Sequence, residues 1–119
     1  MPLGVIAKNS TYIYTVGNIL VSLDYQKGDF GTDDVSILKN ALDIAHRYDQ
    51  TYSSRIEIIN QKKFLITSRN AQGIQGLSFI GLSKSGHIKL IGTLQYDPVE
   101  ETNAQNFLKD LLSSVTYKK

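Results

Sequence analysis

The chain carries few side chains that could act as a catalyst. It has 2 histidines, His46 and His87, and no cysteine. Nucleophilic catalysis needs a base beside the nucleophile, yet His46 is expected late in a helix and His87 at the start of a strand, on its polar face. No Gly-x-Ser-x-Gly motif surrounds any serine. The sequence therefore predicts no catalytic residue, and we expect a protein that is not an enzyme.

The residues that could bind an ion gather in the first long loop, residues 26–33, which contains Asp29 and Asp33. Calcium takes several oxygen ligands, and an EF-hand loop has a fixed spacing that ends on a glutamate, which this loop lacks. Its glycines also lack the Gly-Lys-Ser/Thr ending of a phosphate-binding loop. Without cysteine, zinc-thiolate and iron–sulfur sites are excluded. We therefore expect no metal and no cofactor.

Tyrosine is the residue whose abundance points to binding, since the chain has 7 tyrosines and no tryptophan. Tyrosine is amphipathic and enriched at protein interfaces. Tyr48 and Tyr52 lie at the end of the first predicted helix and would be neighbours if its last turn continued. Together with Asp29 and Phe30 of the preceding loop, they are the predicted protein-binding residues. Packing at the rim of the core is the alternative interpretation for the tyrosines.

Length and charge further limit the kinds of protein that this chain could be. With 119 residues and a net charge of +2, the chain is expected to form one domain over residues 1–119. Its lysines are scattered, which argues against nucleic acid. No apolar run reaches the ~18 residues of a membrane span. Residues 1–10 do not resemble a signal peptide, so we expect a cytoplasmic protein, or an exported one whose signal has been removed.

The clearest structural pattern lies in residues 87–96, where apolar and polar residues alternate. Strict alternation is typical of an antiparallel strand with one buried face, because successive side chains point to opposite faces. The predicted inward residues are Ile88, Leu90, Gly92, Leu94 and Tyr96. Other strands are predicted at residues 11–15, 19–25, 55–60, 64–69 and 77–83. Turns are expected at Gly17-Asn18, at Gln61-Lys62 and over residues 84–86, with a polar loop over residues 70–76.

Two helices complete the expected fold. The first is predicted over residues 34–49, capped by Thr32 or Asp33, with an apolar stripe of Val35, Leu38, Leu42 and Ala45. The second follows Asp97-Pro98, with Asp97 as cap, Glu100 completing a capping box, and Thr102 as a second candidate cap. Its stripe is Ala104, Phe107, Leu108, Leu111, Leu112 and Val115. The sequence thus predicts an α+β domain, order ββαββββα, with a mainly antiparallel sheet of five or six strands and two main helices.

The end of the chain carries a family resemblance. Residues 77–83, residues 86–96 and the closing segment Asn-Phe-Leu-Lys-Asp-Leu-Leu-Ser-Ser-Val-Thr-Tyr at 106–117 give a strand hairpin, a short polar loop and a final helix. This order resembles the PsbP-like superfamily of α/β sandwich domains, whose relatives include Ran-binding Mog proteins and bacterial DcrB-like lipoproteins. The resemblance implies a non-enzymatic accessory or binding domain, often attached to a membrane complex, and offers no catalytic motif.

We therefore expect a non-catalytic binding or accessory domain that acts through a protein partner. One alternative is a domain that holds a small apolar molecule between helix and sheet, which would need an unfilled cavity. Another is a profilin- or longin-like adaptor, which also places a helix across an antiparallel sheet and would differ in strand order. Among enzymes, only a carboxylate- or lysine-based mechanism remains open.

Overall fold

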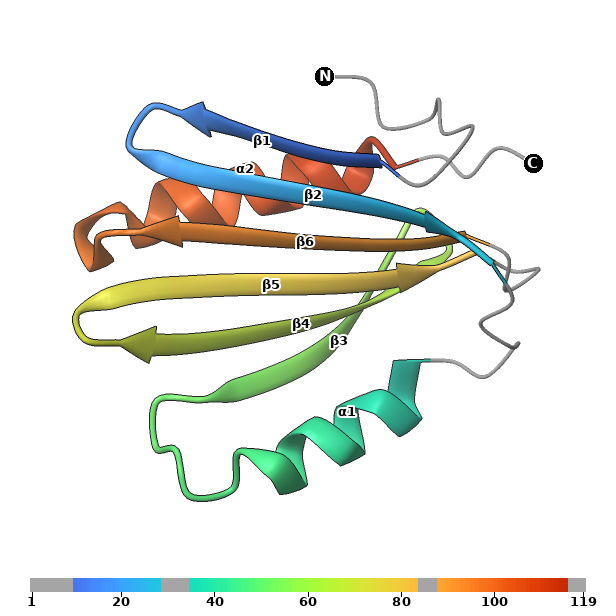
Figure 1. The fold of residues 1–119 in the computed structure, drawn as a ribbon, viewed down its shortest axis with the longest axis horizontal. Coiled ribbons are helices and arrows are strands. Elements are labelled where there is room, and N and C mark those ends of the chain that lie inside the picture. Colours follow the sequence, from blue (N-terminus) through green and yellow to red (C-terminus); the bar gives the residue numbers. More distant parts are fainter. Residues whose placement is uncertain (1–9, 29–34, 84–87, 116–119) are drawn as a thin grey trace.

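The computed structural model of the protein describes residues 10–28, 35–83 and 88–115. The strands in these ranges are β1 (Ser10–Val16), β2 (Ile19–Lys27), β3 (Ser53–Ile59), β4 (Lys62–Ala71), β5 (Ile74–Leu82) and β6 (Ile88–Tyr96). The α-helices are α1 (Val35–Ala45) and α2 (Glu101–Ser113), and a short 3₁₀ helix (Pro98–Glu100) precedes α2 (Figure 1). The predicted α+β class and the element order ββαββββα are confirmed.

All six described strands form one antiparallel sheet in the order β1-β2-β6-β5-β4-β3. Most neighbours are hairpins formed by consecutive strands. The pairing of β2 with β6 is different, because it places Leu20 opposite Gln95 and Lys27 opposite Ile88. The segment that contains α1 carries the chain from β2 to β3, so that β1 and β3 become the edge strands.

The first two hairpin turns contain residues with positive φ. The predicted Gly17-Asn18 turn is confirmed, with φ 58° at Gly17 and a pair between the flanking residues. The turn expected at residues 61–62 lies one residue earlier, at Asn60 and Gln61, whose φ angles are 51° and 66°. Positive φ at both central residues gives the turn the twist that a two-residue hairpin needs.

The prediction of a polar loop over residues 70–76 is wrong for most of that range. Strands β4 and β5 continue through most of it, and only Gln72 and Gly73 form the turn, with φ angles of 55° and 85°. Gly76 is therefore a strand residue. The turn expected over residues 84–86 lies outside the described residues.

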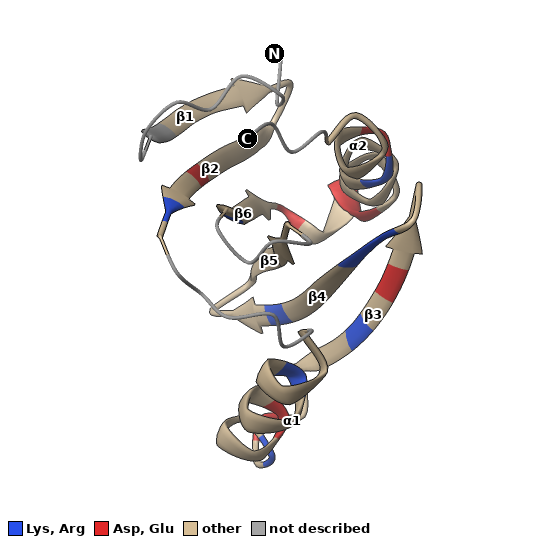
Figure 2. Ribbon diagram, turned by 90° about the vertical axis from the view of Figure 1, so that its right-hand side faces the viewer, with Lys and Arg blue, Asp and Glu red and all other residues tan. Residues whose placement is uncertain are grey.

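The sheet is strongly curved, and its concave face wraps around α2 (Figure 2). The alternation predicted for β6 is confirmed, since the five expected inward residues are all buried. Strand β2 alternates in the same way. The other large buried residues of the concave face are Val21, Leu23, Tyr25, Phe64, Ile66, Leu77 and Phe79, and α2 covers them with Ala104, Leu108, Leu111 and Leu112.

Asp97 caps the short 3₁₀ helix that leads into α2, whereas α2 itself begins without a side-chain cap. The Oδ1 of Asp97 accepts a hydrogen bond from the backbone N–H of Val99 at 3.1 Å. The expected capping box is wrong, because the carboxylate of Glu100 accepts from Asn103 (2.8 Å) instead of reaching back to residue 97. Thr102, the second candidate cap, lies inside the helix.

Helix α1 is shorter than the predicted 34–49. It ends at Ala45, and the chain then tightens into turns in which Asp49 N–H donates to the carbonyl of His46 at 2.9 Å. The caps expected at Thr32 or Asp33 lie outside the described residues.

Helix α1 lies on the convex face and contacts β3, β4 and β5 (Figures 1 and 2). Because it covers only this part of the sheet, its predicted apolar stripe is only partly buried. Val35 is buried, Leu38 and Leu42 are half-buried, and Ala45 is exposed.

Candidate functional site

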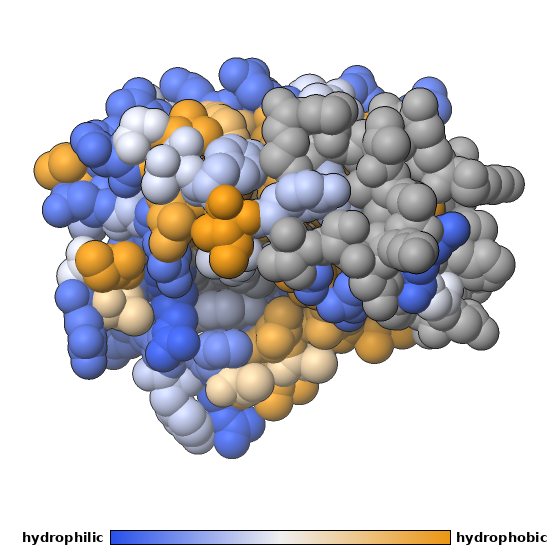
Figure 3. Space-filling model, turned by 45° about the horizontal axis from the view of Figure 1, so that its top comes forward, coloured by the Kyte–Doolittle hydropathy of each residue, from blue (hydrophilic) through white to orange (hydrophobic). Residues whose placement is uncertain are grey.

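The outward face of α1 is mostly apolar, with Asn40 as the one exposed polar residue of the helix, which is unusual for a helix on the surface of a domain. Ile37, Ala41, Ile44, Ala45 and Tyr48 are all exposed, at spacings that place them along one side of the helix and its last turn. The exposed fractions of Ile37, Ile44 and Tyr48 are 62%, 63% and 87%. We call these five residues the outer stripe. In Figure 3, an orange and tan band runs along the lower margin, where α1 lies.

Polar contacts help to fix which face of α1 is turned outward. The Asp43 carboxylate accepts from Lys39 Nζ at 2.7 Å, one turn back on α1, and from the Ser54 hydroxyl on β3. These two hydrogen bonds hold the pKa of Asp43 below its ordinary value. Asp43 therefore ties α1 to the edge strand β3, and the opposite side of the helix is left to carry the isoleucines.

The contrast with α2 shows that an apolar outer face is not a general property of the helices of this domain. The exposed residues of α2 are all polar or charged. They are Thr102, Asn103, Asn106, Lys109, Asp110 and Ser113. A helix that only has to cover a core needs such a polar outer face, so the apolar outer face of α1 calls for another explanation.

Tyr48 ends the outer stripe. The Arg47 guanidinium lies over its ring, with the central carbon 4.9 Å from the ring centroid. This cation–π contact reduces the freedom of an otherwise exposed ring. Tyr48 is thus exposed at the surface, and its binding role stays a prediction.

Tyr52 lies elsewhere, since its ring stacks on His46, with centroids 4.3 Å apart and the planes 11° from parallel. Its hydroxyl is buried and makes no hydrogen bond with the described residues. Burial raises the pKa of Tyr52 above its ordinary value, and the nearby Asp43 charge adds to the effect. In the described residues the two tyrosines have different ring partners, so the structure does not bring them together as one contact pair.

Three other residues singled out in the sequence lie outside the described residues. They are Asp29 and Phe30 of the predicted binding set, and His87. Among the described residues, no group of three or more metal-ligating side chains is present. No helix in those ranges has the length and apolar character that a membrane crossing requires.

No protein-family model matches the chain, and no curated protein sequence is significantly similar to it. The site must therefore be interpreted from its own chemistry.

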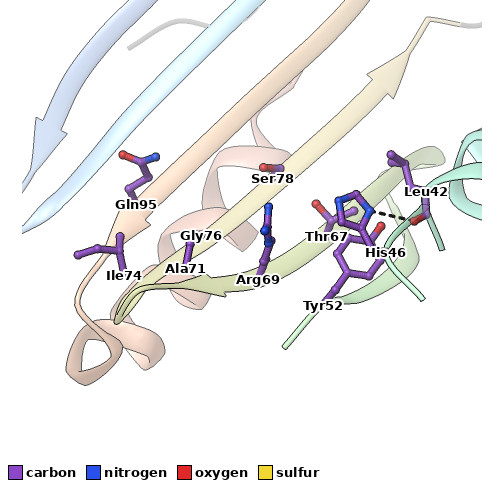
Figure 4. A pocket seen from close by; sticks show the side chains of 10 residues that line it. All are labelled: Leu42, His46, Tyr52, Thr67, Arg69, Ala71, Ile74, Gly76, Ser78 and Gln95. Atoms are coloured by element: carbon purple, nitrogen blue, oxygen red, sulfur yellow. Dashed lines mark hydrogen bonds between the residues drawn. The ribbon is translucent and has the colours of Figure 1, made fainter. Parts of the chain in front are cut away.

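A hollow of about 530 Å³ lies behind α1, on the convex face of the sheet (Figure 4). Leu42 of α1, together with His46 and Tyr52 from the segment after it, forms one side of the hollow, called here its helical side. Strands β4, β5 and β6 form its floor. Figure 3 shows a shadowed recess bordering the apolar band of α1.

The two ends of the hollow are held by hydrogen bonds. His46 Nδ1 donates to the carbonyl oxygen of Leu42 at 2.9 Å, and Nε2 makes no hydrogen bond with the described residues. Arg69 Nε donates to Asp49 Oδ2 at 2.8 Å. Asp49 also accepts from the hydroxyl and backbone N–H of Thr51, and these bonds hold the pKa of Asp49 below its ordinary value.

Sequence reasoning selected only Tyr48 of the outer stripe and only Tyr52 of the hollow, and it missed the rest of each surface for different reasons. The outer stripe left a signal, because Ile37, Ala41, Ile44 and Tyr48 recur at spacings of four, three and four. That signal competed with the inward stripe on the same helix. The hollow left none, because its floor depends on the register of three strands.

Proposed function

We propose that this domain is a non-catalytic binding module that engages a protein partner through the outer stripe of α1. The observation that carries the proposal is that the outward face of α1 is mostly apolar, whereas the outward face of α2 is polar. Two isoleucines on one helix face are more than half exposed to water. A partner that covered them would gain the hydrophobic free energy of their burial. Full burial of such a side chain stabilises by about 1.5–3 kcal/mol, so two of them and a tyrosine suffice for a specific contact.

The shape of the surface indicates the kind of partner. The outer stripe is a convex ridge about three turns long, which fits an apolar groove or the surface between two helices. Tyrosine is among the residues that dominate binding energies at interfaces. Arg47, beside Tyr48, supplies a charged rim at one end. The expected partner is therefore a protein with an apolar groove.

The proposal agrees in kind with what the resemblance to PsbP-like domains implies, an accessory or binding role. The alternative of an apolar ligand held between helix and sheet has less support. On the concave side, the large side chains between α2 and the sheet are buried and in mutual contact. On the convex side, the floor of the hollow includes an arginine and three other polar side chains, which a purely apolar ligand would leave without partners. An adaptor of the profilin or longin kind would also act through a protein partner.

The test places a photo-crosslinking amino acid, p-benzoylphenylalanine, at position 44 of the outer stripe. The matched control carries it at position 106, on the polar outer face of α2. We expect a crosslinked protein from position 44 alone, lost when Ile37→Glu is added. A crosslinked dimer of this chain would identify the partner as a second copy. Equal crosslinking from both positions, or none from position 44, would overturn the proposal.

A further inference from the structure

We propose that the hollow behind α1 binds a small organic acid, with Arg69 holding its carboxylate. This site is separate from the outer stripe, because the hollow lies on the sheet-facing side of α1. The acid is about the size of an aromatic amino acid, given that the hollow measures about 530 Å³ and that ligand pockets span about 300–1,000 Å³.

The hollow exists because Gly76 lies in the middle of its floor. Gly76 pairs with Arg69 on β4 and with Gln95 on β6, so these two side chains flank an empty position. A Cβ at Gly76 would meet the carbonyl oxygens of Arg69 and Leu94 at 3.7 and 4.0 Å, which is ordinary contact. Packing therefore does not require glycine at this strand position, where glycine weakens a strand. Because Gly76 has no side chain, the space above it stays open.

The polar groups around that space are not used by the protein. The side chains of Thr67, Ser78 and Gln95 make no hydrogen bond with any described residue. Thr67 and Ser78 are directly paired across β4 and β5. Neighbouring strands lie about 4.8 Å apart, so donors and acceptors on three strands fall within the span of one small molecule.

Arg69 supplies the recognition of the acid. Its Nε is held by Asp49, while its two terminal nitrogens make no hydrogen bond with the described residues. A guanidinium fork matches the two oxygens of a carboxylate. Asp49 partly offsets the positive charge, which favours a singly charged carboxylate over a doubly charged phosphate. Figure 4 shows the Arg69 side chain rising from the floor between Gln95 and Thr67.

The helical side of the hollow selects the rest of the molecule. Because His46 Nδ1 donates to Leu42, its Nε2 can accept a hydrogen bond from a ligand hydroxyl. Stacking on Tyr52 fixes the plane of the imidazole. Leu42 on this side, and Ala71 and Ile74 on the floor, add apolar surface. The ligand expected is thus an acid with an apolar body and a hydroxyl group.

The experiment is a titration of the ¹⁵N-labelled protein, followed by the backbone amide signals of residues 76 and 78. The probe is 4-hydroxyphenylacetate, and the neutral control is 4-hydroxyphenylacetamide. For a ligand of this size we expect saturable shifts with Kd in the low-millimolar range. The amide and phenyl phosphate are expected to bind at least tenfold more weakly.

Two variants locate the site. Gly76→Val fills the hollow and Arg69→Gln removes the charge, so each should abolish the shifts. Ser22→Val, on the same face of β2 outside the hollow, should leave them unchanged. Should Gly76→Val fail to fold, Arg69→Gln alone decides. No saturable shift, equal binding of acid and amide, or unchanged binding by Arg69→Gln would overturn the proposal. Ile37→Glu should not affect binding, which separates this test from that of the outer stripe.

Discussion

The ring of Phe79 occupies the space where a side chain on Gly92 would lie. The two residues are directly paired on β5 and β6, and a Cβ built on Gly92 would come within 2.3 Å of the ring atoms Cε1 and Cζ. Phe79 is fully buried at the centre of the concave face. Glycine at position 92 is therefore required by packing, because an aromatic ring covers it across the strands.

Gly92→Ala should destabilise the domain by about 1–3 kcal/mol, since the added methyl group overpacks a closed core. Gly76→Ala is the matched control, because its Cβ meets only ordinary contacts, and it should be neutral or slightly stabilising. Both are measured by chemical denaturation. In Gly92→Ala, a second change of Phe79→Leu should restore part of the loss. Equal effects of the two glycine variants would contradict this packing.

Gln61→Gly should stabilise the domain by up to about 1 kcal/mol. Gln61 adopts φ 66° in the turn between β3 and β4, a conformation that is strained for a residue with a side chain. The change also creates Asn-Gly, the preferred pair for this turn. Gln50→Gly, at a position without positive φ, is the control and should not stabilise. A lower denaturation midpoint for Gln61→Gly would count against the turn.

Leu111→Ala should lower the free energy of unfolding by about 2–5 kcal/mol, because Leu111 is buried between α2 and the concave face. Ile44→Ala, at the exposed outer stripe, should change it by less than about 0.5 kcal/mol. The pair compares an inward and an outward helix residue in the same denaturation assay. A large loss from Ile44→Ala would mean that the outer stripe serves the fold rather than a partner.

Asp49→Asn should weaken the domain near neutral pH but not in strong acid. The folded pKa of Asp49 lies below its ordinary value of 3.8, mainly through Thr51 and then Arg69. A lowered folded pKa contributes stability above the unfolded pKa, and that stability disappears as pH falls through the folded pKa. The gap between wild type and variant should therefore shrink from about pH 6 to about pH 2.

The same pH series on Thr51→Val provides the check on this interpretation. Removing the Thr51 hydroxyl takes away the largest contribution to the lowered pKa of Asp49, so part of the same pH dependence should be lost. A gap for Asp49→Asn that is constant across the range would show that the carboxylate is not stabilised by folding.

The strands were predictable because their signal is local. The alternation of residues 87–96 alone indicates which side chains are buried, without reference to the neighbouring strands. In β6 these side chains are the buried ones. The turns were less accurate where positive φ falls on non-glycine residues. Gln61 and Gln72 adopt it because the hairpins impose it, and no side-chain preference of glutamine would indicate this.

The candidate site could be predicted only in part. Tyr48 was chosen as an interface residue by type and is exposed, whereas the isoleucines of the outer stripe were not chosen. Helix α1 has apolar residues on two of its faces. Which face turns toward the sheet is set partly by the hydrogen bond between Ser54 and Asp43, which are eleven residues apart in the chain. Arg69, Gly76 and Gln95 become neighbours only through strand register.

The β2–β6 pairing also has a consequence for the order of assembly. Strands β3 to β6 form three successive hairpins, and α2 follows directly, so these elements need only short chain closures. The pairing of Leu20 with Gln95 closes a much longer loop, which carries a larger entropic cost. We expect the C-terminal meander to form early in folding and the β1–β2 hairpin to dock last, so that the β2–β6 pair is completed only at the end.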